Sequence, residues 1–283
     1  MAEHIRIDGR HAAELPADDR GLAYGDGVFR TLRIESGQPI GWDEHWRRLQ
    51  HDCAALDIAT PGEAEIRADI LALFATRSDG VCKVMVTRGS GGRGYMPPVP
   101  AAPRRIVVAH ALPAHANAEP LALARSSIEL AVQPRLAGIK HLNRLEQVLA
   151  RSECDARGVA DTWMADSQGF IIATTMRNLF FVDASGCWLT PRLTRAGIIG
   201  ATRQRLWRAL AQAGSPVRED DIRLSALIDC RAAIACNSVG GAVAVSHFEG
   251  RALPDSHAQA QYAQRLLREP SAGNTGSDDR KYR

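Results

Sequence analysis

The first third of the chain alternates between two hydrophobic periods. Residues 4–8 and 28–34 carry apolar side chains at every second position, the period of a half-buried strand. Between residues 41 and 58 the apolar positions recur every three or four residues, which predicts an amphipathic helix. The predicted elements of this part are strands over 4–8, 28–34, 81–87 and 104–111 and helices over 41–58 and 62–76.

The pattern breaks after residue 112. Residues 113–120 are rich in alanine and proline and have no periodicity, which predicts a linker between two domains. The elements predicted beyond it are strands over 127–133, 162–166, 170–174, 178–183 and 187–190 and within 231–238, and helices over 141–158, 197–213, 222–229 and 256–267. We therefore expect an α+β protein with a smaller domain over 1–112, a larger one over 121–268 and a disordered polar tail over 269–283.

Composition excludes several classes of protein. The chain has 283 residues, 45% of them hydrophobic, and its formal net charge is only +3, which gives no support for nucleic-acid binding. It has no apolar run of the ~20 residues that a membrane helix needs, and its N-terminus has no apolar signal core, so we expect a cytoplasmic protein that does not bind membranes. The six cysteines and nine histidines show no metal-ligand spacing, so no metal site is expected.

The motif GSGGRG, residues 89–94, matches half of a dinucleotide-binding fingerprint. A helix must follow it in that fold, but the next residues are YMPPVP, and prolines there prevent a helix. A Rossmann site is therefore not expected. Two interpretations stay open: a flexible hairpin loop, or a loop that brings Arg93 and Tyr95 over a site.

Four stretches in a fixed order resemble one enzyme family. They are DRGLAYGDGVFRT at 19–31, HWRRL at 45–49, GIKHLNRLEQVLAR at 138–151, and RNLFF at 177–181 followed by LTPRLTRAGIIGATRQRL at 189–206. In this order they are similar to the two-domain fold-type IV enzymes that use pyridoxal 5′-phosphate (PLP), a family that includes branched-chain and D-amino acid aminotransferases and aminodeoxychorismate lyases. RGSGGRGY at 88–95 and KHLNRLEQVLAR at 140–151 are most similar to the lyases.

The resemblance implies that Lys140 forms the Schiff base with PLP. An amine reacts with an aldehyde only when it is unprotonated, and burial lowers the pKa of a lysine. Judged on the residue alone, an exposed lysine at a helix start is the commoner case. The resemblance also implies that Arg48 binds the cofactor phosphate, for which a guanidinium is suited because it can bond two oxygens at once.

The same family pattern implies further phosphate contacts in the larger domain. The segment 197–202 resembles a loop that leads into a helix N-terminus, where free N–H groups and the helix dipole favour an anion. The phosphate contacts expected from it, and from a second loop, are Ile199, Gly200, Ala201, Thr202, Asn237 and Ser238. Each of these residues is equally an ordinary cap or turn residue by its type.

The lyases of this family act on a small molecule with two carboxylates. Arg30 and Arg93 are the candidates to bind those carboxylates, with Tyr95 and Asn143 as further substrate contacts, although exposed surface arginines are an equal alternative. By resemblance we expect elimination of pyruvate from 4-amino-4-deoxychorismate to give 4-aminobenzoate, a folate precursor, with each site built at a homodimer interface.

One position departs from the family. Relatives carry a glutamate that keeps the pyridine nitrogen of PLP protonated, and Ala173 stands there in this chain. Thr174 or Thr175 is left to bond that nitrogen, although a hydroxyl does not hold a proton firmly. Transamination needs the full electron sink more than an elimination that forms an aromatic product does. The alternatives to the lyase are an aminotransferase of the same fold and a non-catalytic PLP-binding relative.

Overall fold

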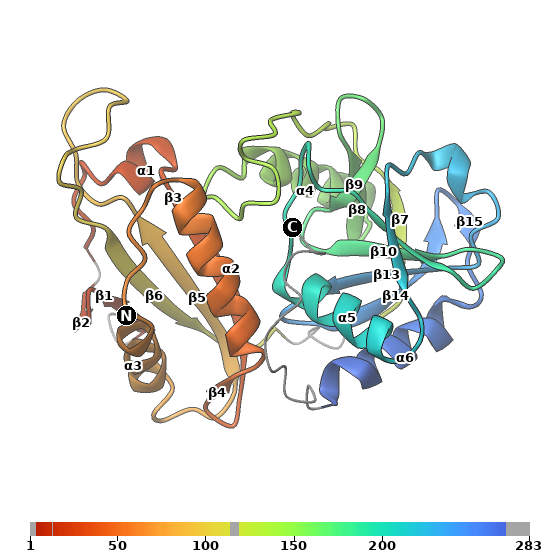
Figure 1. The fold of residues 1–283 in the computed structure, drawn as a ribbon, viewed down its shortest axis with the longest axis horizontal. Helices are drawn as coiled ribbons and strands as arrows, with labels where there is room; N and C mark the ends of the chain where they lie inside the picture. Colours follow the sequence, from red (N-terminus) through yellow and green to blue (C-terminus); the bar gives the residue numbers. More distant parts are fainter. Residues whose placement is uncertain (1–3, 13, 114–118, 270–283) are drawn as a thin grey trace.

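The computed structural model describes residues 4–12, 14–113 and 119–269, and within them the chain forms two lobes around two separate sheets. Figure 1 shows the lobes side by side, with the long helix α2 (Trp42–Ala55) on the side of the N-terminal lobe that faces the C-terminal lobe. The expected α+β architecture is confirmed. Most of the predicted linker and tail, residues 114–118 and 270–283, lie outside the described residues.

The N-terminal lobe is an antiparallel sheet covered on one face by two helices. Its six strands have the order β2-β1-β6-β5-β3-β4. Their bounds are β1 Ile5–Ile7, β2 Arg10–His11, β3 Gly27–Glu35, β4 Gln38–Pro39, β5 Gly80–Thr87 and β6 Arg104–His110, and the helices are α1 Arg20–Tyr24, α2 and α3 Glu63–Leu73. Alternate residues of β3 and β5 are buried against α2 and α3, as the period of two predicts.

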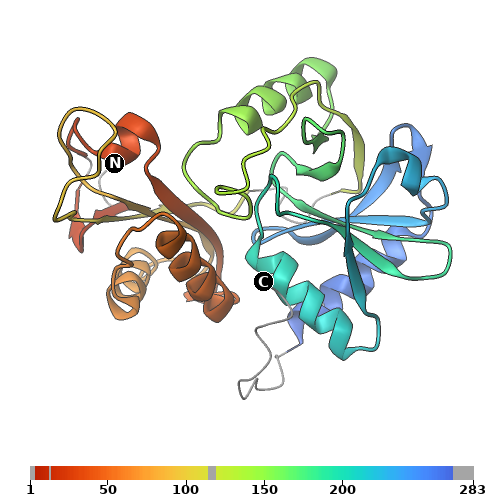
Figure 2. The same cartoon turned by 45° about the horizontal axis from the view of Figure 1, so that its top comes forward.

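The C-terminal lobe is built on a mixed sheet of nine strands in the order β12-β11-β10-β13-β14-β7-β8-β9, with β15 paired to β14. Their bounds are β7 Leu121–Arg125, β8 Asp161–Ala165, β9 Ile171–Thr174, β10 Asn178–Val182, β11 Trp188–Pro191, β12 Val217–Asp220, β13 Ala232–Asn237, β14 Gly241–Phe248 and β15 Arg251–Ala252. The helices are α4 Leu145–Arg157, α5 Ala201–Gln212, the 3₁₀ helix η2 Leu224–Leu227 and α6 Ser256–Arg268. Figure 2 shows α5 and α6 side by side on one side of the sheet, with α4 on the other.

Four predicted elements differ from the structure. The helix expected over 222–229 is only the 3₁₀ helix η2, and the helix expected from residue 197 begins at Ala201. Residues 127–133 form no strand, and only Leu130 makes an isolated bridge, to Asp166. The helix expected from residue 141 begins at Leu145. It starts late because the preceding backbone is bonded to β3 instead: Phe29 N donates to Lys140 O at 2.9 Å, and Leu142 N donates to Gly27 O at 2.9 Å.

Candidate active site

The segment that carries Lys140 runs between the two lobes and is bonded to both. In the N-terminal lobe, Phe29 and the carboxylate of Asp52 contact the backbone of Lys140; its N–H donates to Asp52 Oδ2 at 2.9 Å. In the C-terminal lobe, Gly138 N donates to Gly197 O at 3.0 Å, and Ile199 N donates to Gly138 O at 3.0 Å. Gly138 has φ +79°, a conformation that favours glycine. The backbone of Lys140 is thus fixed from both sides.

The amine of Lys140 lies over the ring of Phe29, with Nζ 4.2 Å from the ring centroid. Burial first, and then the positive charges of Arg30, Arg144 and Lys83, together lower the pKa of this amine to about 7. The residue as a whole is half-buried, and burial of the amine disfavours its charged form. A lysine of this kind is unprotonated in part near neutral pH, as a nucleophile towards an aldehyde must be.

Arg48 lies on α2 beside the same segment. It is 9% exposed, and its Nη2 donates to Gly138 O and to Asp52 Oδ1, each at 3.0 Å. Burial lowers the pKa of this guanidinium to about 10. Its Nε is buried and has no partner among the described residues, and the same is true of His45 Nδ1. A buried guanidinium with an unused N–H donor is suited to an anion.

The start of α5 and the turn after β13 meet at a second set of polar groups. Thr202 Oγ1 lies 3.1 Å from Ser238 Oγ, although the two residues are 36 positions apart. The Asn237 side chain shapes the turn, because its Oδ1 accepts from Val239 N at 3.1 Å and from Gly240 N at 2.8 Å. The predicted contacts Thr202 and Ser238 are therefore close together, and the Asn237 side chain stabilises the turn that carries Ser238.

The amide groups of this loop are divided between internal bonds and free donors. Ile199 N is used by Gly138 O, and Gly200 N donates to Asn178 Oδ1 at 3.1 Å. A Cβ on Gly200 would lie 2.4 Å from that oxygen, so a larger residue there would displace the Asn178 side chain. Ala201 and Thr202 begin the helix, and the amides of a first turn have no partner within the helix. Asn178, which also donates to Ile198 O at 2.8 Å, was not among the predicted contacts although it lies in the quoted RNLFF stretch.

The structure separates the predicted substrate contacts. Arg30 is 2% exposed and its guanidinium is bonded to Asp52 and to Arg48 O, so it lies inside the N-terminal lobe rather than at an open surface. Asn143 is exposed, and its Nδ2 donates to Gly25 O at 3.2 Å. Arg93 and Tyr95 are exposed in the loop after β5, and within the described part of the chain no hydrogen bond or ring contact joins either of them to Lys140.

The position of the missing acid is clear from strand pairing. Ala173 on β9 is directly opposite Asn178 on β10. The hydroxyl of Thr174 accepts from Arg177 N at 2.9 Å, and the hydroxyl of Thr175 donates to Asp161 Oδ1 at 2.6 Å. Both hydroxyls that the sequence offered for the pyridine nitrogen are therefore engaged elsewhere.

Sequence reasoning missed Lys83. Its Nζ lies 5.0 Å from the centroid of the same Phe29 ring that Lys140 contacts. Lys83 is opposite Thr31 in the pairing of β5 with β3, on the sheet face that α2 and α3 leave uncovered. The chain has only three lysines, Lys83, Lys140 and Lys281, so their rarity was a signal that could have found it.

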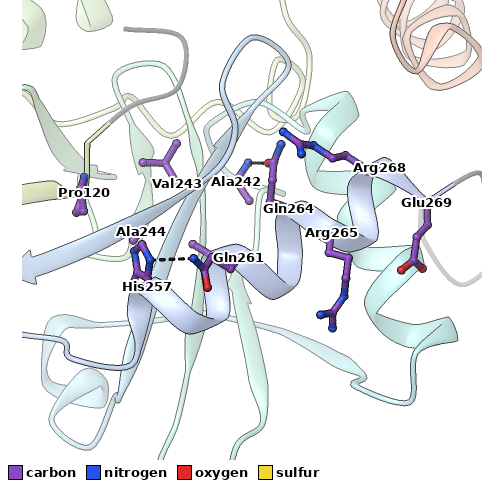
Figure 3. Close-up of a pocket in the computed structure, with 11 residues that line it drawn as sticks. Pro120, Ala242, Val243, Ala244, His257, Gln261, Gln264, Arg265, Arg268 and Glu269 are labelled. Atoms are coloured by element: carbon purple, nitrogen blue, oxygen red, sulfur yellow. Dashed lines mark hydrogen bonds between the residues drawn. The ribbon is translucent and has the colours of Figure 1, made fainter.

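A separate groove of about 620 Å³ lies between β14 and α6 (Figure 3). Gln264 lines it and accepts from Ala242 N at 2.8 Å, and none of the residues that line the groove belongs to the cluster around Lys140. Within the described ranges, no helix is long and apolar enough to cross a membrane, and no group of His, Cys, Asp or Glu residues could hold a metal ion.

The residues around Lys140 fit PLP. The depressed amine pKa suits an aldehyde, and Arg48 Nε, the two hydroxyls and the first amides of α5 are the donors that a phosphate needs. Lys140 would hold the cofactor covalently, with Arg48, Thr202 and Ser238 towards its phosphate.

Comparisons with known proteins agree with this fit. A family model described as "Amino-transferase class IV" matches residues 27–248. The chain is 33% identical over 243 residues to "Aminodeoxychorismate lyase" from Vibrio harveyi, covering 85% of this chain and 89% of the relative. The crystal structure of 4-amino-4-deoxychorismate lyase from Pseudomonas aeruginosa is 38% identical, with a TM-score of 0.86 over 93% of this chain and 98% of that one.

A more distant structure shares the fold alone. The PLP-bound form of a hypothetical aminotransferase from Mycobacterium tuberculosis is 20% identical, with a TM-score of 0.81 over 93% of this chain and 97% of that one. The family match spans most of the chain, from the start of β3 to the end of β14. The chain therefore belongs to the class IV aminotransferase family, the fold-type IV enzymes, and its cofactor is PLP.

Proposed function

We propose that the chain is a lyase that eliminates pyruvate from 4-amino-4-deoxychorismate and releases 4-aminobenzoate, a precursor of folate. The observation that carries the proposal is the similarity to two such lyases, at 33% and 38% identity, over nearly the whole chain. The Lys140 segment adds support, because its KHLNRLEQVLAR sequence holds an amine of lowered pKa between the lobes.

In this proposal Lys140 performs the proton transfers. Bound PLP supplies the electron sink for the carbon that carries the amine of the substrate. The amine of Lys140 would take the proton from that carbon as a general base. The same group is then the nearest donor for the proton that the departing enolpyruvyl group needs. A pKa near 7 suits both steps, since an acid–base group works best when its pKa is close to the operating pH.

The two substrate carboxylates need cationic partners. Lys83 is our candidate for one of them, because its amine lies on the same phenylalanine ring as that of Lys140 and on an uncovered sheet face. Arg30 is buried and bonded to Asp52, so we assign it to the interior of the N-terminal lobe and not to substrate binding.

A second copy of the chain is our candidate source of the loop with Arg93 and Tyr95. Exposed apolar side chains on α1, on this loop and on α4 support a homodimer, since contiguous apolar surface marks interaction sites. They are Leu22, Tyr95, Met96, Val99, Leu145, Val148 and Leu149. Light scattering tests the dimer, and Met96→Asp with Leu145→Asp is expected to give monomers that have lost lyase activity.

The departure at Ala173 favours a lyase over an aminotransferase. Without an acid beside the pyridine nitrogen the electron sink is weak, and the Thr174 and Thr175 hydroxyls have other partners. An elimination that ends in an aromatic ring tolerates a weaker sink, because aromatisation stabilises the product. Slow transamination is therefore expected from the wild-type protein.

Product formation tests the proposal. PLP-loaded protein is mixed with 4-amino-4-deoxychorismate, without a keto acid, and pyruvate and 4-aminobenzoate are measured. Equal amounts of both products are expected, with none from Lys140→Ala. Lys83→Met is expected to raise KM about tenfold or more, because a lost charge-assisted contact costs roughly 1.5–3 kcal/mol. Conversion of the cofactor to its amine form by amino acids, with no 4-aminobenzoate, would identify an aminotransferase instead.

A further inference from the structure

The carboxylate of Asp52 lies where α2, the phosphate arginine and the lysine segment meet. It is fully buried, and both of its oxygens are used. Oδ1 accepts from Arg48 Nη2 at 3.0 Å and lies 3.1 Å from His51 Nδ1. Oδ2 accepts from Lys140 N at 2.9 Å and from Arg30 Nη2. One side chain of the N-terminal lobe thus contacts the backbone of the candidate catalytic lysine, which lies on the segment between the lobes.

The two buried arginines beside Asp52, Arg30 and Arg48, need a negative charge close to them. Burial and the charge of Arg48 lower the pKa of Arg30 to about 9, and burial lowers that of Arg48 to about 10. Two buried guanidinium groups without a counter-ion would be strongly unfavourable. Asp52 offsets one of the two positive charges. Glu44, which is also buried on α2, acts on both arginines as well, and Arg48 keeps an unused Nε donor for the phosphate of PLP.

We propose that Asp52 is a positioning residue that fixes the backbone of Lys140 relative to Arg48 and supplies the negative charge that balances the buried arginines. Its hydrogen bond to Lys140 N fixes the position of the Lys140 backbone, and the Lys140 side chain then places Nζ over Phe29. The lysine that holds the aldehyde of PLP and the arginine that holds its phosphate are then at a fixed separation. The inference rests on the proposed role of Lys140.

The test compares three variants of PLP-loaded protein. Asp52→Asn keeps an acceptor for Lys140 N but removes the charge, and Asp52→Ala removes both. Asp69→Asn is the matched control, because Asp69 is 2% exposed on α3 of the same lobe and accepts from Arg6 Nε at 2.8 Å and Arg105 Nε at 2.6 Å. The readouts are the pH titration of the visible absorbance of lysine-bound PLP, the affinity for PLP, and thermal unfolding.

Each variant has its own expected result. In Asp52→Asn the titration midpoint falls by about one pH unit, because losing a nearby negative charge disfavours the protonated form of the lysine–cofactor bond. In Asp52→Ala the affinity for PLP also falls about tenfold, since Lys140 N–H and Arg48 lose their acceptor. Asp69→Asn lowers the unfolding temperature. It leaves the titration midpoint unchanged and the affinity for PLP within about twofold of that of the wild type.

A double variant provides the rescue. Arg30→Met combined with Asp52→Asn removes one charge of each sign, so the midpoint is expected to return at least halfway to that of the wild type. The proposal is overturned if Asp52→Asn and Asp69→Asn titrate alike, or if the double variant shifts further downward. Should Asp52 variants fail to fold, hydrogen exchange of the wild type decides, because fast exchange at the Lys140 amide would contradict its bond to Asp52.

Failure of the proposed function gives a different result. If wild-type protein and Lys140→Ala show the same titration, the role of Lys140 is wrong, and that of Asp52 with it. If they differ and Asp52→Asn matches the wild type, only the inference about Asp52 is wrong. Neither comparison needs 4-amino-4-deoxychorismate, so both are independent of substrate identity.

Discussion

Replacement of Arg48 by methionine tests the phosphate site in isolation from the chemistry at Lys140. Methionine keeps much of the length and volume of the stem and removes the guanidinium. Two things change: PLP loses a cationic partner, and Asp52 Oδ1 and Gly138 O each lose a donor at 3.0 Å. The first change affects cofactor affinity, and the second affects the stability of the protein without cofactor.

The structure sets the size of each effect. A charge-assisted hydrogen bond contributes roughly 1.5–3 kcal/mol, and 1.4 kcal/mol corresponds to a factor of ten, so PLP should bind about 10 to 150 times more weakly. Loss of a donor to buried acceptors costs about 1–3 kcal/mol, partly offset because a buried cation is removed. The matched control is Arg47→Met on the same helix, whose side chain is 44% exposed and pairs with Glu44 at 2.7 Å. An exposed pair of this kind contributes roughly 0–1 kcal/mol.

The assay is a titration of cofactor-free protein with PLP, followed by absorbance, beside thermal unfolding of the same samples without PLP. Arg47→Met should match the wild type in affinity. If Arg48→Met binds PLP as tightly as Arg47→Met does, Arg48 does not contact the phosphate, whatever happens to its stability.

Three further predictions follow from the same site. Thr202→Val and Ser238→Ala should each weaken PLP binding about threefold to tenfold. Because the two hydroxyls lie 3.1 Å apart, the double variant should lose less binding free energy than the sum of the two single losses. Strictly additive losses would mean that the two hydroxyls do not bind the same group. Without PLP, Lys140→Met should stabilise the fold by a few kcal/mol at about pH 6 and by less at about pH 9. The pKa of Lys140 is about 7 in the folded state and its ordinary value is 10.5, so between these pH values the folded state binds fewer protons and wild-type stability rises with pH. A difference in unfolding temperature that does not change with pH would refute the lowered pKa. Ala173→Glu should speed conversion of bound PLP to its amine form by amino acids, and efficient conversion by the wild type would contradict the electron-sink argument.

The sequence predicts the site through motifs better than through periodicity. Thr202 and Ser238 were chosen from separate family-like loops, and the structure brings their hydroxyls together. Arg30 is predicted as a substrate contact from its charge and its family-like position, although strand alternation already indicates the direction of its side chain. It occupies the position between Val28 and Leu32, both of which are buried under α2, so its side chain has to point inward.

Tertiary bonds explain what the pattern could not predict. The helix that begins at Leu145 has a suitable sequence from residue 141, but Leu142 N is bonded to Gly27 O, a partner more than 110 positions away. Asp52 is one of several polar residues on α2 by sequence, and only the approach of the Lys140 segment shows what it contacts. Contacts between the lobes cannot be predicted from local sequence, because the residues around one partner do not indicate which distant residue it contacts.

Reduction of the PLP-loaded protein with borohydride, followed by peptide mass spectrometry, tests the central claim most directly. The chain has three lysines, so the position of the reduced cofactor is unambiguous. The account predicts one adduct, on Lys140, with Lys83 unlabelled although its amine lies over the same ring. An adduct on Lys83, or none on a protein that binds PLP, would contradict it.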